Sequence, residues 1–181
     1  MLLKVEGNHF VAILNGIGQW WKTNGESIRG TTRTPLAVQA WGESTPKGNA
    51  LYLHVFTWPR DGKLVVGGLK TGVKSAYLLS DPKRASLPTE RVNSLDLLVK
   101  VPTDAPDKVD SVLVLQCEAQ PVGDPVRLVS LSTTNILRAF DRELRGKTLR
   151  FGPGKTRDAY VENWSKETDS IFWPLRLIRS G

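Results

Sequence analysis

Three aromatic side chains near the C-terminus lie among side chains that bind hydroxyl groups. Tyr160, Trp164 and Trp173 share one stretch of chain with the polar residues Glu162, Asn163 and Asp169. Aromatic rings stack on the C–H faces of sugars, and amides and carboxylates bind sugar hydroxyls. The pattern therefore indicates a carbohydrate-binding site. The same residues are also compatible with the core and corners of a β-sandwich that binds nothing.

Cleavage of a glycosidic bond would need a pair of carboxyl groups. The two groups lie ~5 Å apart in retaining enzymes and more than ~6 Å apart in inverting ones. Asp107 and Asp110 flank a turn before a strand, and Glu26 follows Asn24 and Gly25 at a helix end. Turn and helix-end formation explain these carboxylates, so we predict no catalytic residue in this sequence.

Histidine and cysteine are too few and too dispersed for a metal site. The chain has two histidines and one cysteine. His54 lies within a strand pattern and is expected to be a hydrogen-bonded histidine on a sheet face. Cys117 follows an apolar strand and is expected to be a small buried hydrophobe. We therefore expect no metal, no cofactor and no internal disulfide.

The charge is basic but spread along the chain. The 181 residues carry 25 Lys and Arg against 18 Asp and Glu, for a net charge of +7. There is no run of five basic residues and no zinc finger or aromatic RNA-binding signature, so we expect no nucleic-acid partner. Apolar runs fall far short of the ~18 residues that span a bilayer, so we expect no membrane partner. The first eight residues do not have the pattern of a signal peptide, and the sequence indicates no compartment.

An amphipathic helix is predicted over residues 10–23. Its apolar positions have a period of 3.6 residues, and they are Phe10, Ile13, Leu14, Ile17, Trp20 and Trp21. Gly25 would be the C′ residue with positive φ. A lone helix of this kind is marginal in water, so it must pack on another element.

From about residue 37 the apolar period changes to two, which predicts strands. Alternation over 37–43 and 51–56 is followed by strands near 64–66, 73–79, 95–101 and 112–115, with turns at 47–49 and 58–62. Short strands with turns at this spacing indicate an antiparallel sandwich or barrel. Two more strands are predicted over 144–151 and 171–178. The fold class is mainly β: an N-terminal helix, an antiparallel β-sandwich and the start of a second, incomplete β module.

Three stretches, in this order, resemble the C-terminal part of bacterial alpha-L-fucosidases, the family-29 glycoside hydrolases. They are IGQWWKTNGESIRGT at 17–31, KGNALYLHVFTWP with DGKL at 47–64, and PDKVDSV at 106–112. In that family a similar helix and loop closes the catalytic barrel, and a β-sandwich follows. A looser match, LRGKTLRF at 144–151 with Trp164 and Trp173, is similar to the opening of an appended carbohydrate-binding-like module.

The resemblance implies four segments and a parent activity. Residues 1–35 would be the end of the barrel, 36–118 the sandwich, 119–125 a linker and 126–181 a partial β module. The parent enzyme would hydrolyse terminal alpha-L-fucosides of glycans, using two carboxylates carried by a barrel that no residue here matches. We therefore expect a C-terminal fragment that is inactive alone and that partners such a barrel. The family is commonly secreted, periplasmic or lysosomal. The alternative is a non-catalytic carbohydrate-binding or accessory module using Tyr160, Trp164 and Trp173.

Overall fold

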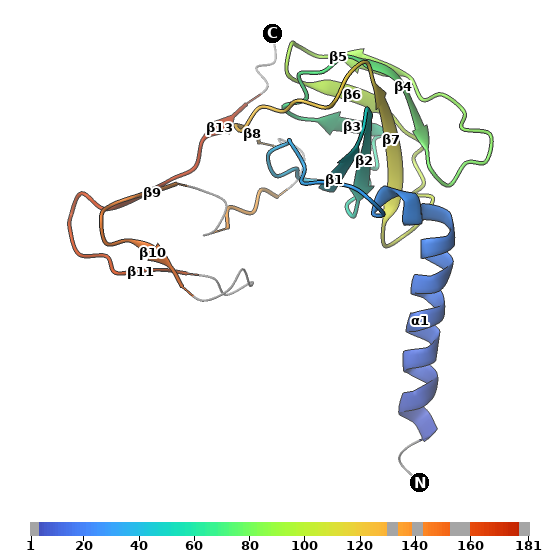
Figure 1. Ribbon diagram of the computed structural model, residues 1–181, viewed down its shortest axis with the longest axis horizontal. Helices are drawn as coiled ribbons and strands as arrows, with labels where there is room; N and C mark the ends of the chain where they lie inside the picture. The colour runs from blue at the N-terminus through green and yellow to red at the C-terminus, as the bar shows by residue number, and fades with distance from the viewer. Residues whose placement is uncertain (1–3, 130–133, 139–142, 153–159, 178–181) are drawn as a thin grey trace.

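The computed structural model describes residues 4–129, 134–138, 143–152 and 160–177, and it is mainly β. One helix, α1 (Lys4–Asn24), leads through a short 3-10 turn, η1 (Gly25–Ser27), into the strands. The helix and the antiparallel sheets confirm the predicted fold class. Figure 1 shows α1 standing away from the sheets, with the short C-terminal ladders on the opposite side of the molecule.

The larger sheet of the sandwich, which we call the first sheet, has four antiparallel strands. Their order is β1 (Gly42–Lys47), β2 (Ala50–Val55), β7 (Ser111–Cys117) and β4 (Val73–Leu78). The predicted turn joins β1 to β2, and Gly48 within it has a φ of +57°, which glycine adopts without steric cost. The antiparallel register pairs His54 of β2 with Glu43 of β1 and with Val112 of β7.

The strand predicted over 37–43 is wrong in its position, because β1 begins only at Gly42. Instead of pairing in a β-ladder, this segment contacts β3 (Lys63–Val66), a strand of a second sheet, and the residue that follows it. Gln39 exchanges hydrogen bonds with the backbone of Gly67, and the Trp41 indole donates to the carbonyl of Val65 at 2.8 Å. The segment therefore closes one edge of the sandwich.

A second, three-stranded sheet faces the first one. Its order is β3 (Lys63–Val66), β6 (Leu97–Lys100) and β5 (Thr89–Arg91), and the last of these was not predicted. Alternate residues of both sheets point inward and form the main core, which includes Leu51, Leu53, Leu64, Val66, Val99, Leu113 and Leu115. Strand alternation with turns every ten residues or so thus produces two packed sheets.

The outer face of the first sheet is also covered. Tyr52, Val112 and Val114 form a second apolar cluster there, on the side away from the main core. Trp20, near the C-terminal end of α1, is packed against this cluster. Strand β2 is therefore buried on both faces, as its uninterrupted run of bulky residues indicates.

The C-terminal segment forms three two-stranded ladders. β9 (Glu143–Arg145) pairs with β12 (Ser170–Phe172), and β10 (Arg150–Phe151) pairs with β11 (Val161–Glu162). β13 (Leu175–Arg176) pairs in parallel with β8 (Arg127–Leu128). The long strands predicted over 144–151 and 171–178 are each interrupted within their described parts. Residues 146–149 form a turn in the first, and Pro174, which lacks a backbone donor, follows β12 in the second.

Candidate functional site

A set of contacts, which we call the helix junction, attaches α1 and η1 to the outer face of the first sheet. It comprises Trp20, Ser27, Thr45, His54 and Asp110. The Trp20 indole donates to the backbone carbonyl of Asp110 at 2.9 Å, and its ring centroid lies 6.1 Å from that of His54. The buried His54 places Nδ1 2.9 Å from the Asp110 carboxylate. The Trp20 ring and the hydrogen bond between His54 and Asp110 thus hold the helix end.

One hydroxyl group within the helix junction contacts both η1 and the histidine. Thr45 Oγ1 donates to the carbonyl oxygen of Ser27 at 2.5 Å, and it lies 3.5 Å from His54 Nε2. The Ser27 hydroxyl in turn donates to the carbonyl oxygen of Asn24 at 2.7 Å. Strand β1 is therefore linked through one side chain to the residues that follow α1.

A second polar group lies beside the helix junction. The Tyr52 hydroxyl donates to Glu26, and burial followed by the negative charge of Glu26 raises the pKa of Tyr52. Arg84, in the loop after β4, lies 5.2 Å from the ring centroid of Tyr77 and 4.0 Å from Glu26. These contacts connect η1 to β2 and β4.

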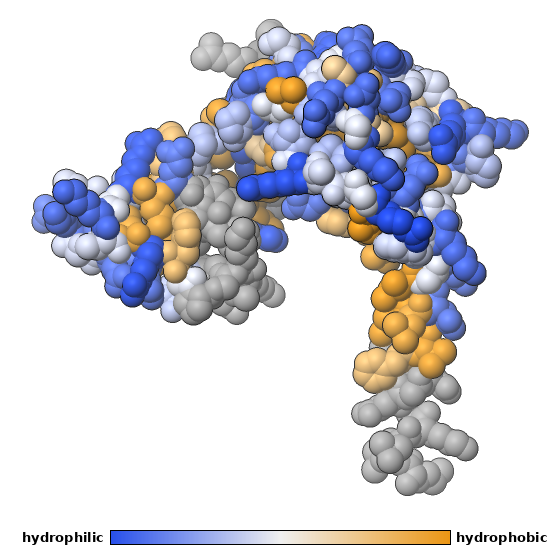
Figure 2. Space-filling model, viewed as in Figure 1, coloured by the Kyte–Doolittle hydropathy of each residue, from blue (hydrophilic) through white to orange (hydrophobic). Residues whose placement is uncertain are grey.

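Beyond the helix junction, the apolar face of α1 is exposed. Phe10 is 64% exposed, Leu14 66% and Ile17 57%. Figure 2 shows this apolar surface running along the helix, away from the sandwich. A contiguous apolar surface of this kind marks an interaction site. Neither helix of the described residues combines the length and the apolar character needed to cross a membrane.

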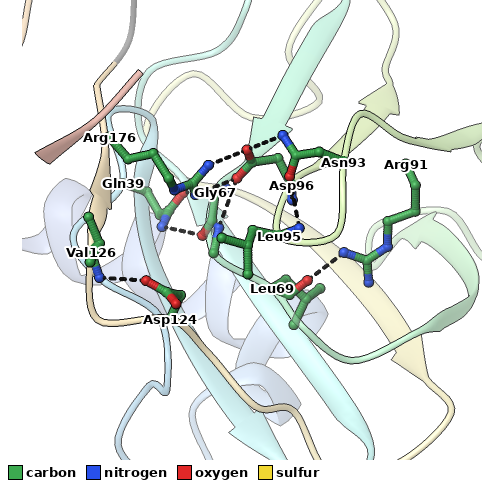
Figure 3. Close-up of polar contacts among 11 residues, drawn as sticks. Gln39, Gly67, Leu69, Arg91, Asn93, Leu95, Asp96, Asp124, Val126 and Arg176 are labelled. Atoms are coloured by element: carbon green, nitrogen blue, oxygen red, sulfur yellow. Dashed lines mark hydrogen bonds and ion pairs between the residues drawn. The ribbon is translucent and has the colours of Figure 1, made fainter. Parts of the chain in front are cut away.

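A buried ion pair fixes the end of the chain to the sandwich (Figure 3). Asp96, which is fully buried just before β6, accepts hydrogen bonds from both terminal nitrogens of Arg176 in β13. Its carboxylate also accepts from the Asn93 amide at 2.8 Å and from the Gly68 backbone at 3.1 Å. Burial raises the pKa of Asp96, but these hydrogen bonds and the Arg176 charge outweigh burial and hold it below the ordinary range.

The three predicted sugar-binding aromatics occupy different positions in the C-terminal ladders. Tyr160 is 52% exposed and precedes β11, and Trp164 is 53% exposed in the turn that follows β11. The Trp164 indole donates to the Val161 carbonyl, and the half-buried Trp173 donates to the Arg138 carbonyl. No hydrogen bond or ring contact among the described residues joins any two of the three. Their role in binding stays a prediction.

Four of the described aspartates have hydrogen-bond partners within the fold. Asp107 accepts hydrogen bonds from the backbone of Val109 and Asp110, as predicted for a turn. Asp110 is hydrogen-bonded to His54, a contact that the turn prediction did not include. Hydrogen bonds from the backbone of Ala85 and Lys83 lower the pKa of Asp81. Hydrogen bonds from the Val126 backbone and the Lys70 side chain lower the pKa of Asp124. A general acid requires a raised pKa, so these groups do not suit that role.

Cys117 and His54 have the environments that their sequence contexts indicate. Burial raises the pKa of the Cys117 thiol to about 11, so the group is a poor nucleophile. His54 is hydrogen-bonded on a sheet face, as predicted. Its carboxylate partner lies 56 residues away, and no local sequence pattern indicated it. Within the described part of the chain, there is no cluster of three or more metal-ligating side chains.

Comparison with solved structures identifies the architecture. Alpha-L-fucosidase isoenzyme 1 from Paenibacillus thiaminolyticus is 34% identical, with a TM-score of 0.52 over 59% of this chain and 26% of that one. The chain resembles the family-29 alpha-L-fucosidases. This confirms the resemblance predicted from the three motifs.

Two further fucosidases match with similar TM-scores and lower identity. The enzyme from Vibrio sp. strain EJY3 is 25% identical, with a TM-score of 0.53 over 67% of this chain and 22% of its own. The Bacteroides thetaiotaomicron GH29 enzyme is 25% identical, with a TM-score of 0.52 over 60% of this chain and 24% of its own. The chain thus spans about a quarter of the length of the fucosidases it matches. No protein-family model and no curated protein matches the sequence.

Proposed function

We propose that this chain is the fucosidase-like β-sandwich of a glycoside hydrolase that releases terminal alpha-L-fucose from glycans. The supporting observation is the similarity to the Paenibacillus thiaminolyticus enzyme over 59% of the chain. In this proposal the catalytic carboxylates belong to a separate barrel, and the exposed apolar face of α1 packs against that barrel. Residues 1–35 then form the contact with the barrel, 36–118 the sandwich, 119–125 the linker and 126–181 an added β module.

In this proposal the 181-residue chain is inactive alone. Stabilising an oxocarbenium-like transition state requires a preorganised pocket with two carboxyl groups at a fixed separation. The buried Asp96 is bonded to Arg176, and the half-buried Asp110 is bonded to His54, so both carboxylates have structural partners. Neither is positioned to protonate a leaving group or to attack a sugar.

An aryl alpha-L-fucoside assay tests the proposed inactivity. The purified chain should release no aryl alcohol above the rate of a heat-denatured sample. Turnover that an iminocyclitol inhibitor abolishes would overturn the proposed inactivity.

A binding experiment with the separately produced catalytic barrel of a matched fucosidase tests whether the apolar face of α1 packs against a barrel. Binding of the barrel should weaken at least tenfold in Leu14→Glu and be unchanged in the control Val109→Glu.

A second candidate function is carbohydrate binding by the C-terminal module. The observation that favours it is the exposure of Tyr160 and Trp164, with the Trp164 indole held by its hydrogen bond to Val161. An exposed ring with a fixed orientation suits stacking on a sugar. Calorimetry against a panel of glycans should detect binding that Trp164→Ala abolishes and the sandwich control Phe56→Ala retains. The absence of binding across the panel would contradict this function.

A further inference from the structure

The helix junction contains a hydroxyl hydrogen for which two acceptors can compete. Thr45 Oγ1 lies between the Ser27 carbonyl of η1, at 2.5 Å, and His54 Nε2, at 3.5 Å. A carbonyl oxygen can only accept, so the Thr45 hydroxyl donates its hydrogen to Ser27. Only the lone pairs of Oγ1 remain to face the imidazole.

Both nitrogens of His54 therefore face acceptors. Nδ1 lies 2.9 Å from the Asp110 carboxylate, which can only accept when ionised. Nε2 faces the lone pairs of Thr45 Oγ1. An imidazole that donates from both nitrogens is the protonated imidazolium, so the contacts match the charged form of His54.

Charged groups of the described residues lie on several elements packed around His54. Asp110 comes from the loop before β7, and Glu43 lies directly opposite on β1. η1 carries Glu26, which bonds Tyr52, and the last turn of α1 carries Lys22. Strand β7 places the apolar Val112 beside the histidine.

We infer that the helix junction is a proton-controlled latch that sets how firmly α1 is held against the sandwich. With His54 protonated, the Thr45 hydroxyl is free to bond Ser27. Loss of the Nε2 proton leaves a lone pair that competes with the Ser27 carbonyl for the same hydrogen. A proton removed from Nε2 thus weakens the bond between β1 and η1, and α1 is held less firmly as the pH rises.

Electron spin distance measurements between α1 and the first sheet test the latch. Nitroxide labels are placed at the exposed positions Val11→Cys and Lys74→Cys, because the native Cys117 is buried and does not take up label. Between about pH 5.5 and 8, the population with α1 displaced should rise about three- to tenfold, the change expected for one hydrogen bond.

The two histidines of the chain provide a matched control. His9→Gln should keep the pH response, whereas His54→Gln and Thr45→Val should remove it. Thr45→Val removes the shared hydroxyl but leaves the hydrogen bond from the Trp20 indole to Asp110. It therefore still tests the inference if His54→Gln fails to fold. Equal distance distributions at both pH values, or a response that survives in Thr45→Val, would overturn the inference.

Discussion

Arg176 Nη2 donates to Asp96 Oδ1 at 2.6 Å, across a sequence separation of 80 residues. The carboxylate is fully buried and the guanidinium side chain is 20% exposed. This ion pair and the parallel pairing of β13 with β8 hold the C-terminal segment on the sandwich. The intervening ladders are therefore tied to the sandwich at both ends.

Removing the cation from this pair should strongly destabilise the fold. Arg176→Met leaves the Asp96 carboxylate buried without its charge partner, and we expect a loss of about 3–5 kcal/mol in the free energy of unfolding. The exposed Arg145→Met is the matched control and should cost less than about 1 kcal/mol. Urea unfolding measures both. Equal effects of the two substitutions would contradict a structural role for the pair.

The same pair should make stability sensitive to acid. The folded pKa of Asp96 is lowered, because hydrogen bonds and the Arg176 charge outweigh its burial. The stabilisation is therefore present above the unfolded value of about 3.9 and is lost as the pH falls through the lower folded value. The free energy of unfolding, measured with urea at each pH, should therefore fall less between about pH 5 and 3 in Arg176→Met than in the unsubstituted chain. Equal pH dependence in the two chains would disprove the linkage.

Two glycine substitutions should have opposite effects. A Cβ at Gly123 would lie 1.9 Å from the Pro35 carbonyl oxygen, so Gly123→Ala should destabilise the sandwich by roughly 1–3 kcal/mol. A Cβ at Gly18 would meet nothing within 4 Å, so Gly18→Ala should strengthen α1 by up to about 1 kcal/mol. Thermal unfolding and the helical circular dichroism signal report the two changes. A neutral Gly123→Ala would show that this contact is not tight.

Cys117 should be unreactive in the folded chain. A pKa of about 11 leaves roughly two orders of magnitude less thiolate at pH 8 than an ordinary cysteine has. A chromogenic disulfide reagent should therefore modify Cys117 only after urea is added. The thiol introduced by Val11→Cys on exposed α1 should react at once. Rapid modification of the native thiol would place Cys117 outside the core.

The apolar face of α1 should cause self-association when no partner covers it. Sedimentation velocity of the chain should show concentration-dependent oligomers, because exposed Phe10, Leu14 and Ile17 lower their free energy by leaving water. Leu14→Glu should shift the chain to monomer. Val109→Glu, at a 78% exposed position outside α1, should leave the oligomers unchanged. A monomeric wild-type chain at high concentration would contradict this prediction.

Local sequence patterns predicted the helix and most sandwich strands, but they failed where distant contacts decide the conformation. Gly25 was expected as a C′ residue with positive φ, yet it begins η1, and a Cβ there would lie 3.1 Å from the Trp21 ring. The glycine is needed for close packing, which a capping pattern does not reveal. Residues 37–41 alternate like a strand but bond the opposite sheet through Gln39 and Trp41.

The sequence alone determined the mainly β architecture, the amphipathic α1 and the resemblance to fucosidases, because periodicity, turn residues and ordered motifs are properties of neighbouring residues. Only the tertiary structure decided that His54 pairs with Asp110 and Asp96 with Arg176. These partners are 56 and 80 residues apart, and no local pattern encodes which distant side chains meet. The antiparallel pairing of β2 with β7 brings His54 and Asp110 together, and the pairing of β13 with β8 brings Arg176 to Asp96.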